Sequence, residues 1–179
     1  MENNNTLGLI FSENPEANLG DLMRVRSLAA VPVGGRYRII DFMLSNMVNS
    51  GIVNVGLATG FKNQSLVDHV GSGRAWDMAR KENGLFILPP PENQETGGRI
   101  MGDIDYLSGA LRYLQRSRQE YVMLSDCNTI CNIDFEKVID FHFEKEADIT
   151  MVYTEVENLS SKELEKHILL DVEEDGRVS

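Results

Sequence analysis

The residue types that most often perform chemistry are few in this sequence and stand apart from one another. The two cysteines are Cys127 and Cys131, and two thiols without a nearby histidine make a poor metal site, because structural zinc takes four ligands. We therefore expect both to pack as small apolar side chains. His69, His142 and His167 fall on separate predicted elements, and no serine or cysteine motif accompanies them. A hydrolase triad has no support in the sequence.

Polar stretches follow three short apolar runs, and these stretches are better candidates for a ligand site. The runs Thr6 to Phe11, Ile52 to Ala58 and Tyr121 to Leu124 are each predicted as strands. If the strands are parallel, their carboxyl ends lie along one edge of a sheet, where ligands bind in folds of this kind. We therefore expect the residues that follow the three runs to crowd together.

The elements that would position such a site alternate between strand and helix. Apolar residues recur at helical spacing from Ile39 to Val48, and Gly51 stands where a helix C-cap belongs. The alternation predicts an α/β fold with a mixed, mostly parallel sheet and helices on both faces. Further helices are predicted at Ser65–Val70, Tyr106–Leu114 and Phe135–Phe143, further strands at Leu85–Leu88 and Ile149–Val156, and a hairpin over 167–179.

The stretch 71–100 contains several glycines and prolines and predicts an exposed loop, apart from its one strand. Trp76 lies in this stretch. Aromatic side chains often anchor interfaces, so Trp76 is either a partner contact or a local core plug.

Length and composition bound the class of protein. The 179 residues are 42% hydrophobic and 25% charged, which is typical of one globular domain and excludes a disordered, collagenous or coiled-coil chain. No apolar run reaches membrane-spanning length and no basic, apolar leader is present, so we expect a cytoplasmic protein. The net charge is −11, and residues 134–179 carry 14 acidic against 5 basic side chains. A negative field disfavours nucleic acids and anionic membranes as partners.

One long string of residues is specific enough to indicate a family. It runs from Ala30 to Phe42 (AVPVGGRYRIIDF) and continues in Leu44-Ser45-Asn46 and Asn49-Ser50-Gly51. This string resembles the signature of bacterial glucose-1-phosphate adenylyltransferases, also called ADP-glucose pyrophosphorylases. The resemblance implies a Rossmann-like nucleotidyltransferase fold, truncated here. Residues 1–179 would form the N-terminal part of the nucleotidyltransferase-like domain, and a C-terminal β-helix domain of the parent protein would lie outside this chain.

The resemblance also implies what an active member contains, and the first loop departs from it. The family cradles the triphosphate of ATP with Gly-Gly-x-Gly-x-Arg, where this chain has Glu13-Asn14-Pro15-Glu16-Ala17-Asn18. The glycines are lost, the proline removes an amide donor, and Asn18 replaces the arginine. Two carboxylates would repel a polyanion at this place. We therefore expect that ATP does not bind here in the family's manner.

Two further catalytic positions of the family are replaced. Leu28 stands where the family has the lysine of a Lys-Pro-Ala-Val-Pro run, and leucine cannot hold a phosphate. Asn128 stands where the family has an aspartate for magnesium, and hard cations prefer carboxylates. Asp126 is a candidate to replace the missing aspartate as a magnesium ligand, because residues two apart on a strand share a face. Because these family positions are replaced, we expect no catalytic residue and no cofactor in this chain. Mg²⁺ would be bound only if the chain is active.

Other positions similar to the family are candidates for ligand binding. Gly60, where the family has glutamine, and Lys62 could contact a sugar or a phosphate. Gly102 and Asp105 persist from the family's Gly-Thr-Ala-Asp-Ala element.

Two sets of arginines carry positive charge. The family uses basic positions around the first set for anionic sugar-phosphate effectors, so we expect either an effector site or solvated side chains there. The second set follows a predicted helix, and we expect it to cap and solvate the C-terminal end of that helix. The sets are Arg24, Arg26 and Arg38, and Arg112, Arg116 and Arg118.

The decayed pattern resembles a known branch of the family, the GlgD-type regulatory subunits, which are inactive or nearly so alone and raise the activity of a catalytic subunit in a hetero-oligomer. The resemblance implies a regulatory or stimulating subunit of glucose-1-phosphate adenylyltransferase in glycogen biosynthesis. Its partners would be the catalytic subunit and a sugar-phosphate effector. Two alternatives stay open. One is an active adenylyltransferase that makes ADP-glucose from ATP and glucose 1-phosphate; the other is a stand-alone sensor of a sugar phosphate or ADP-glucose.

Overall fold

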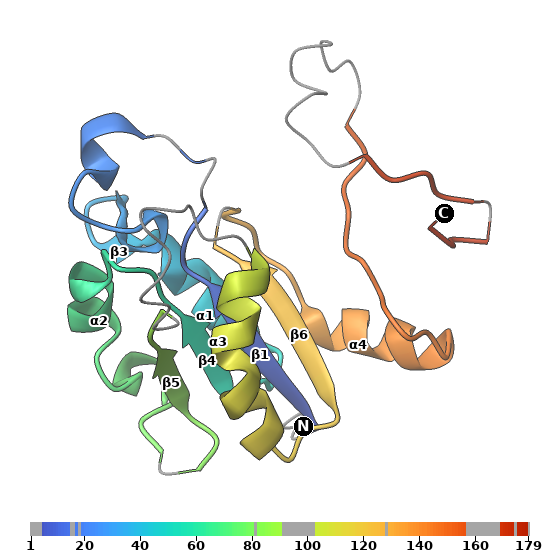
Figure 1. The fold of residues 1–179 in the computed structure, drawn as a ribbon. Helices are drawn as coiled ribbons and strands as arrows, with labels where there is room; N and C mark the ends of the chain where they lie inside the picture. Colours follow the sequence, from blue (N-terminus) through green and yellow to red (C-terminus); the bar gives the residue numbers. More distant parts are fainter. Residues whose placement is uncertain are drawn as a thin grey trace.

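The computed structural model describes residues 5–14, 17, 19–80, 82–90, 103–127, 129–156, 169–173 and 175–178. The centre of the described chain is a four-stranded sheet in the order β5-β4-β1-β6, and every pairing in it is parallel (Figure 1). The strands are β1 (Thr6–Phe11), β4 (Val55–Ala58), β5 (Leu85–Leu88) and β6 (Tyr121–Asp126). β1 and β4 are apolar on both faces because both faces are covered.

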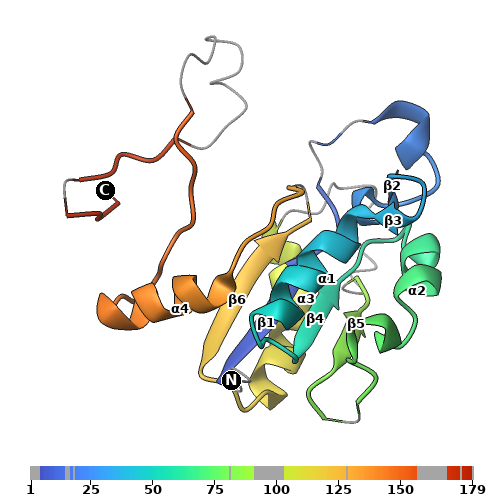
Figure 2. The same cartoon turned by 180° about the vertical axis from the view of Figure 1, so that it is seen from behind.

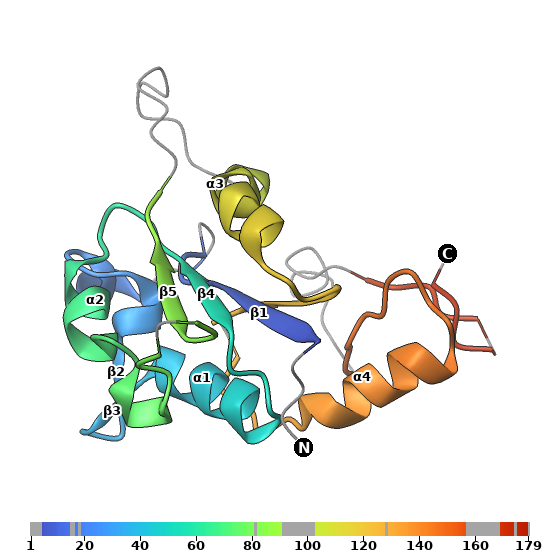
Figure 3. The ribbon, with the colours of Figure 1, turned by 90° about the horizontal axis from the view of Figure 1, so that it is seen from below.

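Helices cover both faces of the sheet (Figures 2 and 3). Buried side chains of α1 (Ile39–Asn49), α2 (Gln64–Val70) and α4 (Phe135–Glu144) share one core with Ile10 and Leu57 of the sheet. Tyr106 and Ala110 of α3 (Asp103–Arg116) pack on the other face, against Leu7 and Leu9. The predicted α/β fold class, with a mostly parallel sheet and helices on both faces, is confirmed.

Short elements complete the described chain. Three 3₁₀ turns are η1 (Gly20–Met23), η2 (Leu28–Ala30) and η3 (Arg74–Trp76), and β2 (Pro32–Val33) pairs antiparallel with β3 (Tyr37–Arg38). Helix α1 begins where the Asp41 carboxylate accepts a hydrogen bond from the Arg38 N–H at 3.0 Å, which satisfies a donor at the helix start. Gly51, with φ of 76°, follows its end as predicted.

The predicted strand over Ile149–Val156 is wrong. These residues belong to no strand, and Ile149 is 82% exposed. A strand requires a partner to satisfy its backbone groups, and within the described part of the chain this segment pairs with none. The predicted hairpin near the end is present as a bridge between Val172 and Val178 around the turn at Gly176.

No helix among the described residues combines the length and the apolarity that crossing a bilayer requires.

Candidate functional site

The carboxyl ends of three strands meet at one edge of the sheet, as predicted. Phe11, the last residue of β1, pairs with Ala58 of β4 on one side and with Asp126 of β6 on the other. The N–H of Ser12 donates to the Ala58 carbonyl at 3.0 Å. The residues that follow these strands therefore lie side by side and form the candidate site.

The centre of this edge is a contact between Glu13 and Gly60. A Cβ atom placed on Gly60 would lie 2.6 Å from Glu13 Oε1 and 2.7 Å from Glu13 Cγ, distances well inside van der Waals contact. The Glu13 side chain thus occupies the space that any larger residue at position 60 would need. Burial raises the pKa of Glu13, and the charge of Lys62 and the backbone N–H of Gly60 oppose that rise.

The segment that carries Gly60 is fixed by a small hydrogen-bond network. Thr59 is fully buried, and its N–H and its hydroxyl both donate to the Leu88 carbonyl, at 2.9 and 3.0 Å. The Asn63 amide donates to the Thr59 hydroxyl at 3.1 Å. This turn therefore holds the Gly60 backbone rigidly beneath Glu13.

A second segment closes the edge from the other side. The N–H of Ala29 donates to the Ser12 carbonyl at 3.4 Å, and the N–H of Ser27 donates to the Lys62 carbonyl at 3.2 Å. Four buried side-chain atoms around this junction have no hydrogen-bond partner among the described residues. They are Ser12 Oγ, Glu13 Oε1, Arg26 Nε and Ser27 Oγ. Buried polar groups without a protein partner are costly, and a bound water, ion or ligand is the usual way to satisfy them.

Leu28 lies in η2 and is only 6% exposed. It packs in the core below α1, so its side chain cannot contact a ligand at this edge. The Lys62 ammonium is exposed and donates to the Met23 carbonyl at 3.4 Å. Of the predicted ligand contacts, Gly60 and Lys62 thus lie at the candidate site.

The three arginines of the first set differ in their surroundings. Arg24 is exposed and Arg26 is half-buried beside the candidate site. Arg38 donates to the Ser65 hydroxyl at 2.8 Å and to the Ser65 carbonyl, so its guanidinium ties β3 to α2. The effector site expected around these three arginines stays a prediction.

Asp126 is the last residue of β6, and Cys127 after it is 1% exposed. Burial, together with the charges of Asp126 and Glu13, raises the pKa of the Cys127 thiol to about 12. The packing expected for Cys127 is confirmed. Cys131 is half-buried, and its carbonyl accepts from the Asn46 amide at 3.0 Å.

Some predicted site residues lie elsewhere. Asn18, Gly102 and Asn128 are outside the described residues. Asp105 is on α3, whose core residues pack on the opposite face of the sheet from α1. Trp76 Nε1 donates to Ser45 Oγ at 3.1 Å and its ring packs on the core, so Trp76 serves local packing.

Among the described residues, the carboxylates at this edge are those of Glu13 and Asp126. Across the described ranges, no three His, Cys, Asp or Glu side chains gather where one ion could be held. The Glu13 side chain is seated against Gly60.

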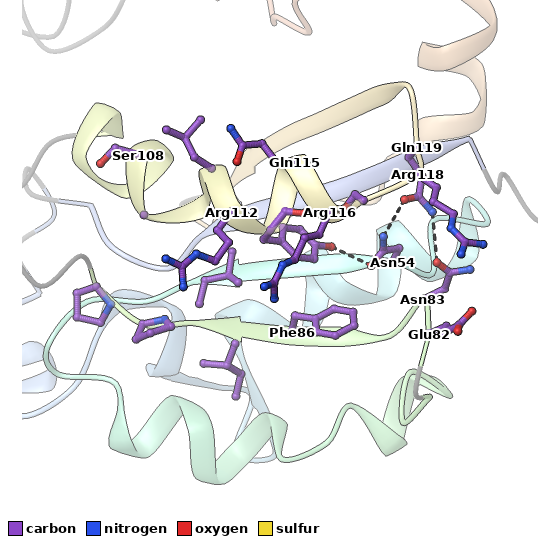
Figure 4. A pocket seen from close by; sticks show the side chains of 18 of the residues that line it. Asn54, Glu82, Asn83, Phe86, Ser108, Arg112, Gln115, Arg116, Arg118 and Gln119 are labelled. Carbon is purple, nitrogen blue, oxygen red and sulfur yellow. Dashed lines mark hydrogen bonds between the residues drawn. The ribbon is translucent and has the colours of Figure 1, made fainter.

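A groove of about 1650 Å³ lies between α3 and β5 (Figure 4), and its lining includes Phe61, the residue after Gly60. Arg112 and Arg116 extend from α3 toward β5, which carries Phe86, so the groove combines cationic and apolar lining. The second set of arginines is exposed as expected, but its place along a groove was not predicted, because only the fold brings α3 beside β5.

At one end of the groove, Tyr113 connects α3 to the start of β4. Its hydroxyl donates to Asn54 Oδ1 at 2.9 Å, and the Asn54 amide donates to Gln119 Oε1 at 2.9 Å. Burial raises the pKa of Tyr113, so the phenol stays a donor at any physiological pH.

Comparison with known proteins identifies relatives over most of the chain. Residues 18–163 match the family described as nucleotidyl transferase. The chain is 42% identical over 170 residues to the glycogen biosynthesis protein GlgD of Geobacillus stearothermophilus. This match covers 95% of this chain and 50% of that protein. It is 36% identical over 156 residues to the glucose-1-phosphate adenylyltransferase of Clostridium beijerinckii, which covers 87% of this chain and 40% of that protein. The chain spans about half the length of the curated relatives it matches, or less.

A solved structure shares the fold. A crystal structure from Bacillus anthracis, described as a glucose-1-phosphate thymidylyltransferase in complex with sucrose, superposes with a TM-score of 0.61 at 15% identity. The match covers 79% of this chain and 51% of that one.

Proposed function

Because this chain belongs to the nucleotidyl transferase family, we propose that it is part of a regulatory subunit of glucose-1-phosphate adenylyltransferase in glycogen biosynthesis rather than of a catalyst. The observation that carries the proposal is the Glu13 side chain seated on Gly60 at the edge where strands β1, β4 and β6 end. The likeness to two GlgD proteins, at 42% and 40% identity, supports the same role.

The chemistry of the edge argues against nucleotidyl transfer. That reaction needs positive groups and amide donors around a triphosphate. The edge instead presents a carboxylate, and Leu28 is buried where the family resemblance places a lysine. A like charge at this position weakens binding of a polyanion, and a regulatory subunit needs no resident cofactor.

The regulatory effect would pass through contacts with a catalytic partner in the cytoplasm. A subunit that contacts the active state of its partner more favourably than the inactive state shifts the partner toward activity. Sugar-phosphate effectors would act by changing that difference. Arg24 and Arg26, beside the edge, are the effector contacts that we propose for this chain, with Lys62.

A second candidate function is a sensor of a sugar phosphate or ADP-glucose that works without a partner. The groove between α3 and β5 favours it, because a lining that includes Arg112, Arg116 and Phe86 suits an anionic ligand with an apolar or stacking portion. This candidate predicts that glucose 1-phosphate raises the melting temperature of the protein alone, and that Arg116→Ala removes the effect.

The test of the first proposal is pyrophosphate release from ATP and glucose 1-phosphate with Mg²⁺. The protein at its full natural length is assayed alone and mixed with the catalytic homologue from the same cell. The proposal predicts no turnover alone and a faster or more effector-sensitive mixture. Turnover alone that Asp126→Ala abolishes would instead establish the active enzyme. If the protein shows no turnover alone and does not change the activity of the mixture, the regulatory role is rejected. The thermal-shift experiment would then decide for or against the sensor.

A further inference from the structure

The groove between α3 and β5 exists because α3 packs on β4 and leaves β5 beside it (Figure 3). Gly56 of β4 allows this close approach, since a Cβ atom there would lie 2.7 Å from Tyr113 Cε1. All four residues of β5 are half-buried, whereas those of β4 are buried. The groove measures about 1650 Å³, which exceeds the roughly 300–1,000 Å³ of sites for compact small ligands. Its size therefore favours an extended occupant.

β5 is an edge strand of the sheet, and the backbone on its outer side is open. The Leu88 carbonyl accepts a hydrogen bond from the Thr59 N–H at 2.9 Å, and the Gly84 carbonyl accepts one from the Val55 N–H at the same distance. Backbone groups alternate sides along a strand, so the N–H and C=O of Ile87 point away from β4. Within the described ranges these two groups have no hydrogen-bond partner. Ile87 lines the groove, so an added strand can bind this open backbone pair.

Positive charge gathers on the α3 side of the groove, although the net charge of the chain is −11. Arg112, Arg116 and Arg118 belong to the described lining, which contains one acidic side chain, that of Glu82. All three arginines are exposed, and Figure 4 shows Arg112 and Arg116 extending toward β5. An occupant with carboxylates on the side that faces α3 complements these charges.

We propose that the groove binds an extended acidic segment of the catalytic partner, which adds to β5 as a further strand and turns its carboxylates toward the three arginines. The inference rests on the proposed regulatory role and names the surface through which that role acts. Helix α3 has 14 residues and is therefore about 21 Å long. An extended segment of about six residues spans the same length. Strand addition supplies backbone hydrogen bonds, and alternate side chains supply specificity.

Binding is measured by fluorescence anisotropy on the protein at its full natural length, with a labelled peptide of about six residues that alternates glutamate and valine. This peptide should bind saturably, and a peptide with lysine in place of each glutamate should bind about tenfold more weakly or not at all. Arg112→Glu combined with Arg116→Glu should weaken the acidic peptide by about tenfold or more. The control combines Lys137→Glu with Lys145→Glu, which makes the same charge change at exposed positions on and after α4, and should leave affinity unchanged.

The added strand is tested separately by hydrogen exchange of the backbone amides, with and without the acidic peptide. The Ile87 N–H should exchange more slowly in the complex, because it then donates to the peptide. The amides of β6, which is the other edge strand, should exchange as before. Unchanged exchange over Leu85–Leu88, or equal slowing over β6, overturns the strand addition.

The proposal is overturned if the acidic peptide does not bind saturably, or if the folded arginine variant binds it as tightly as the wild type. If that variant does not fold, Arg112→Gln combined with Arg116→Gln removes the charges without reversing them, and the same comparison applies. Binding of glucose 1-phosphate without binding of the peptide also overturns the proposal, in favour of the sensor. Self-association of the protein that the peptide abolishes would assign the groove to a second copy and overturn the choice of partner.

The peptide assays use the protein without the catalytic homologue, so the two proposals fail separately. If the mixture shows no stimulation, the regulatory role is rejected, and so is the catalytic subunit as the source of the acidic segment. Stimulation that the folded arginine variant retains in full leaves the regulatory role in place and overturns the groove as its surface. The proposal predicts that this variant binds the peptide weakly and loses most of the stimulation.

Discussion

His69 Nε2 lies 2.6 Å from Asp41 Oδ1, and this contact joins α2 to the first turn of α1. The other oxygen of the same carboxylate accepts the N–H of Arg38, and the Arg38 guanidinium returns to Ser65 at the start of α2. The Asp41 carboxylate therefore links the β2–β3 hairpin, α1 and α2. This network accounts for the half-buried position of Arg38.

Replacing His69 with alanine should lower the free energy of unfolding by about 1 kcal/mol, because a hydrogen bond to a carboxylate is lost in a mostly buried setting. Urea denaturation monitored by circular dichroism measures the change. Asp68→Ala, on the same helix but exposed, should cost less than half as much. Similar costs for both variants would show that the His69–Asp41 contact adds nothing specific.

Tyr113→Phe should lower the free energy of unfolding by about 1–2 kcal/mol. It leaves Asn54 Oδ1, in a residue that is 6% exposed, without its donor, and an unmade buried hydrogen bond costs that much. Tyr153→Phe makes the same change at an exposed tyrosine and should be neutral within error. A neutral Tyr113→Phe would mean that Asn54 finds another donor.

Hydrophobic periodicity was sufficient to predict most of the fold. The apolar positions of α1, between a turn and Gly51, predict the helix from local sequence alone, and the parallel sheet follows from the alternation of elements. The segment Ile149–Val156 shows the limit of this reasoning. Its composition favours a strand, but strand formation depends on a partner that a one-dimensional pattern does not supply.

The candidate site was predicted only in outline. Parallel strands place Ser12, Gly60 and Asp126 at one edge, and that part follows from the sequence. The contact of Glu13 with Gly60 does not, because it joins residues far apart in the chain and depends on the register of β1 and β4. The sequence offered one indication of this contact, in two positions taken together. Glu13 stands where the family resemblance has glycine, and Gly60 stands where it has glutamine.

Glu13 should make stability depend on pH in a defined direction. Burial raises its pKa above the ordinary 4.5, so the folded state binds a proton more readily than the unfolded state. The favourable contribution of Glu13 protonation to folding stability is complete below the pKa of the unfolded state. It is lost as pH rises through the pKa of the folded state. Glu13→Gln should therefore melt higher than the wild type at pH 7, with the difference shrinking as pH falls through the raised folded pKa and gone below about 4.5. Melting curves from pH 4 to 8 measure this, and a constant difference would contradict it.

The two cysteines should differ in reactivity. The thiolate is the reactive form, and a thiol pKa of about 12 leaves Cys127 protonated at neutral pH, in a side chain that is 1% exposed. Iodoacetamide at pH 7.5 should label the half-buried Cys131 first and leave Cys127 unmodified on the same time scale, as measured by peptide mass spectrometry. In urea both should react at similar rates. Rapid labelling of Cys127 in the native protein would mean that the end of β6 opens frequently, and that the edge around Glu13 opens with it.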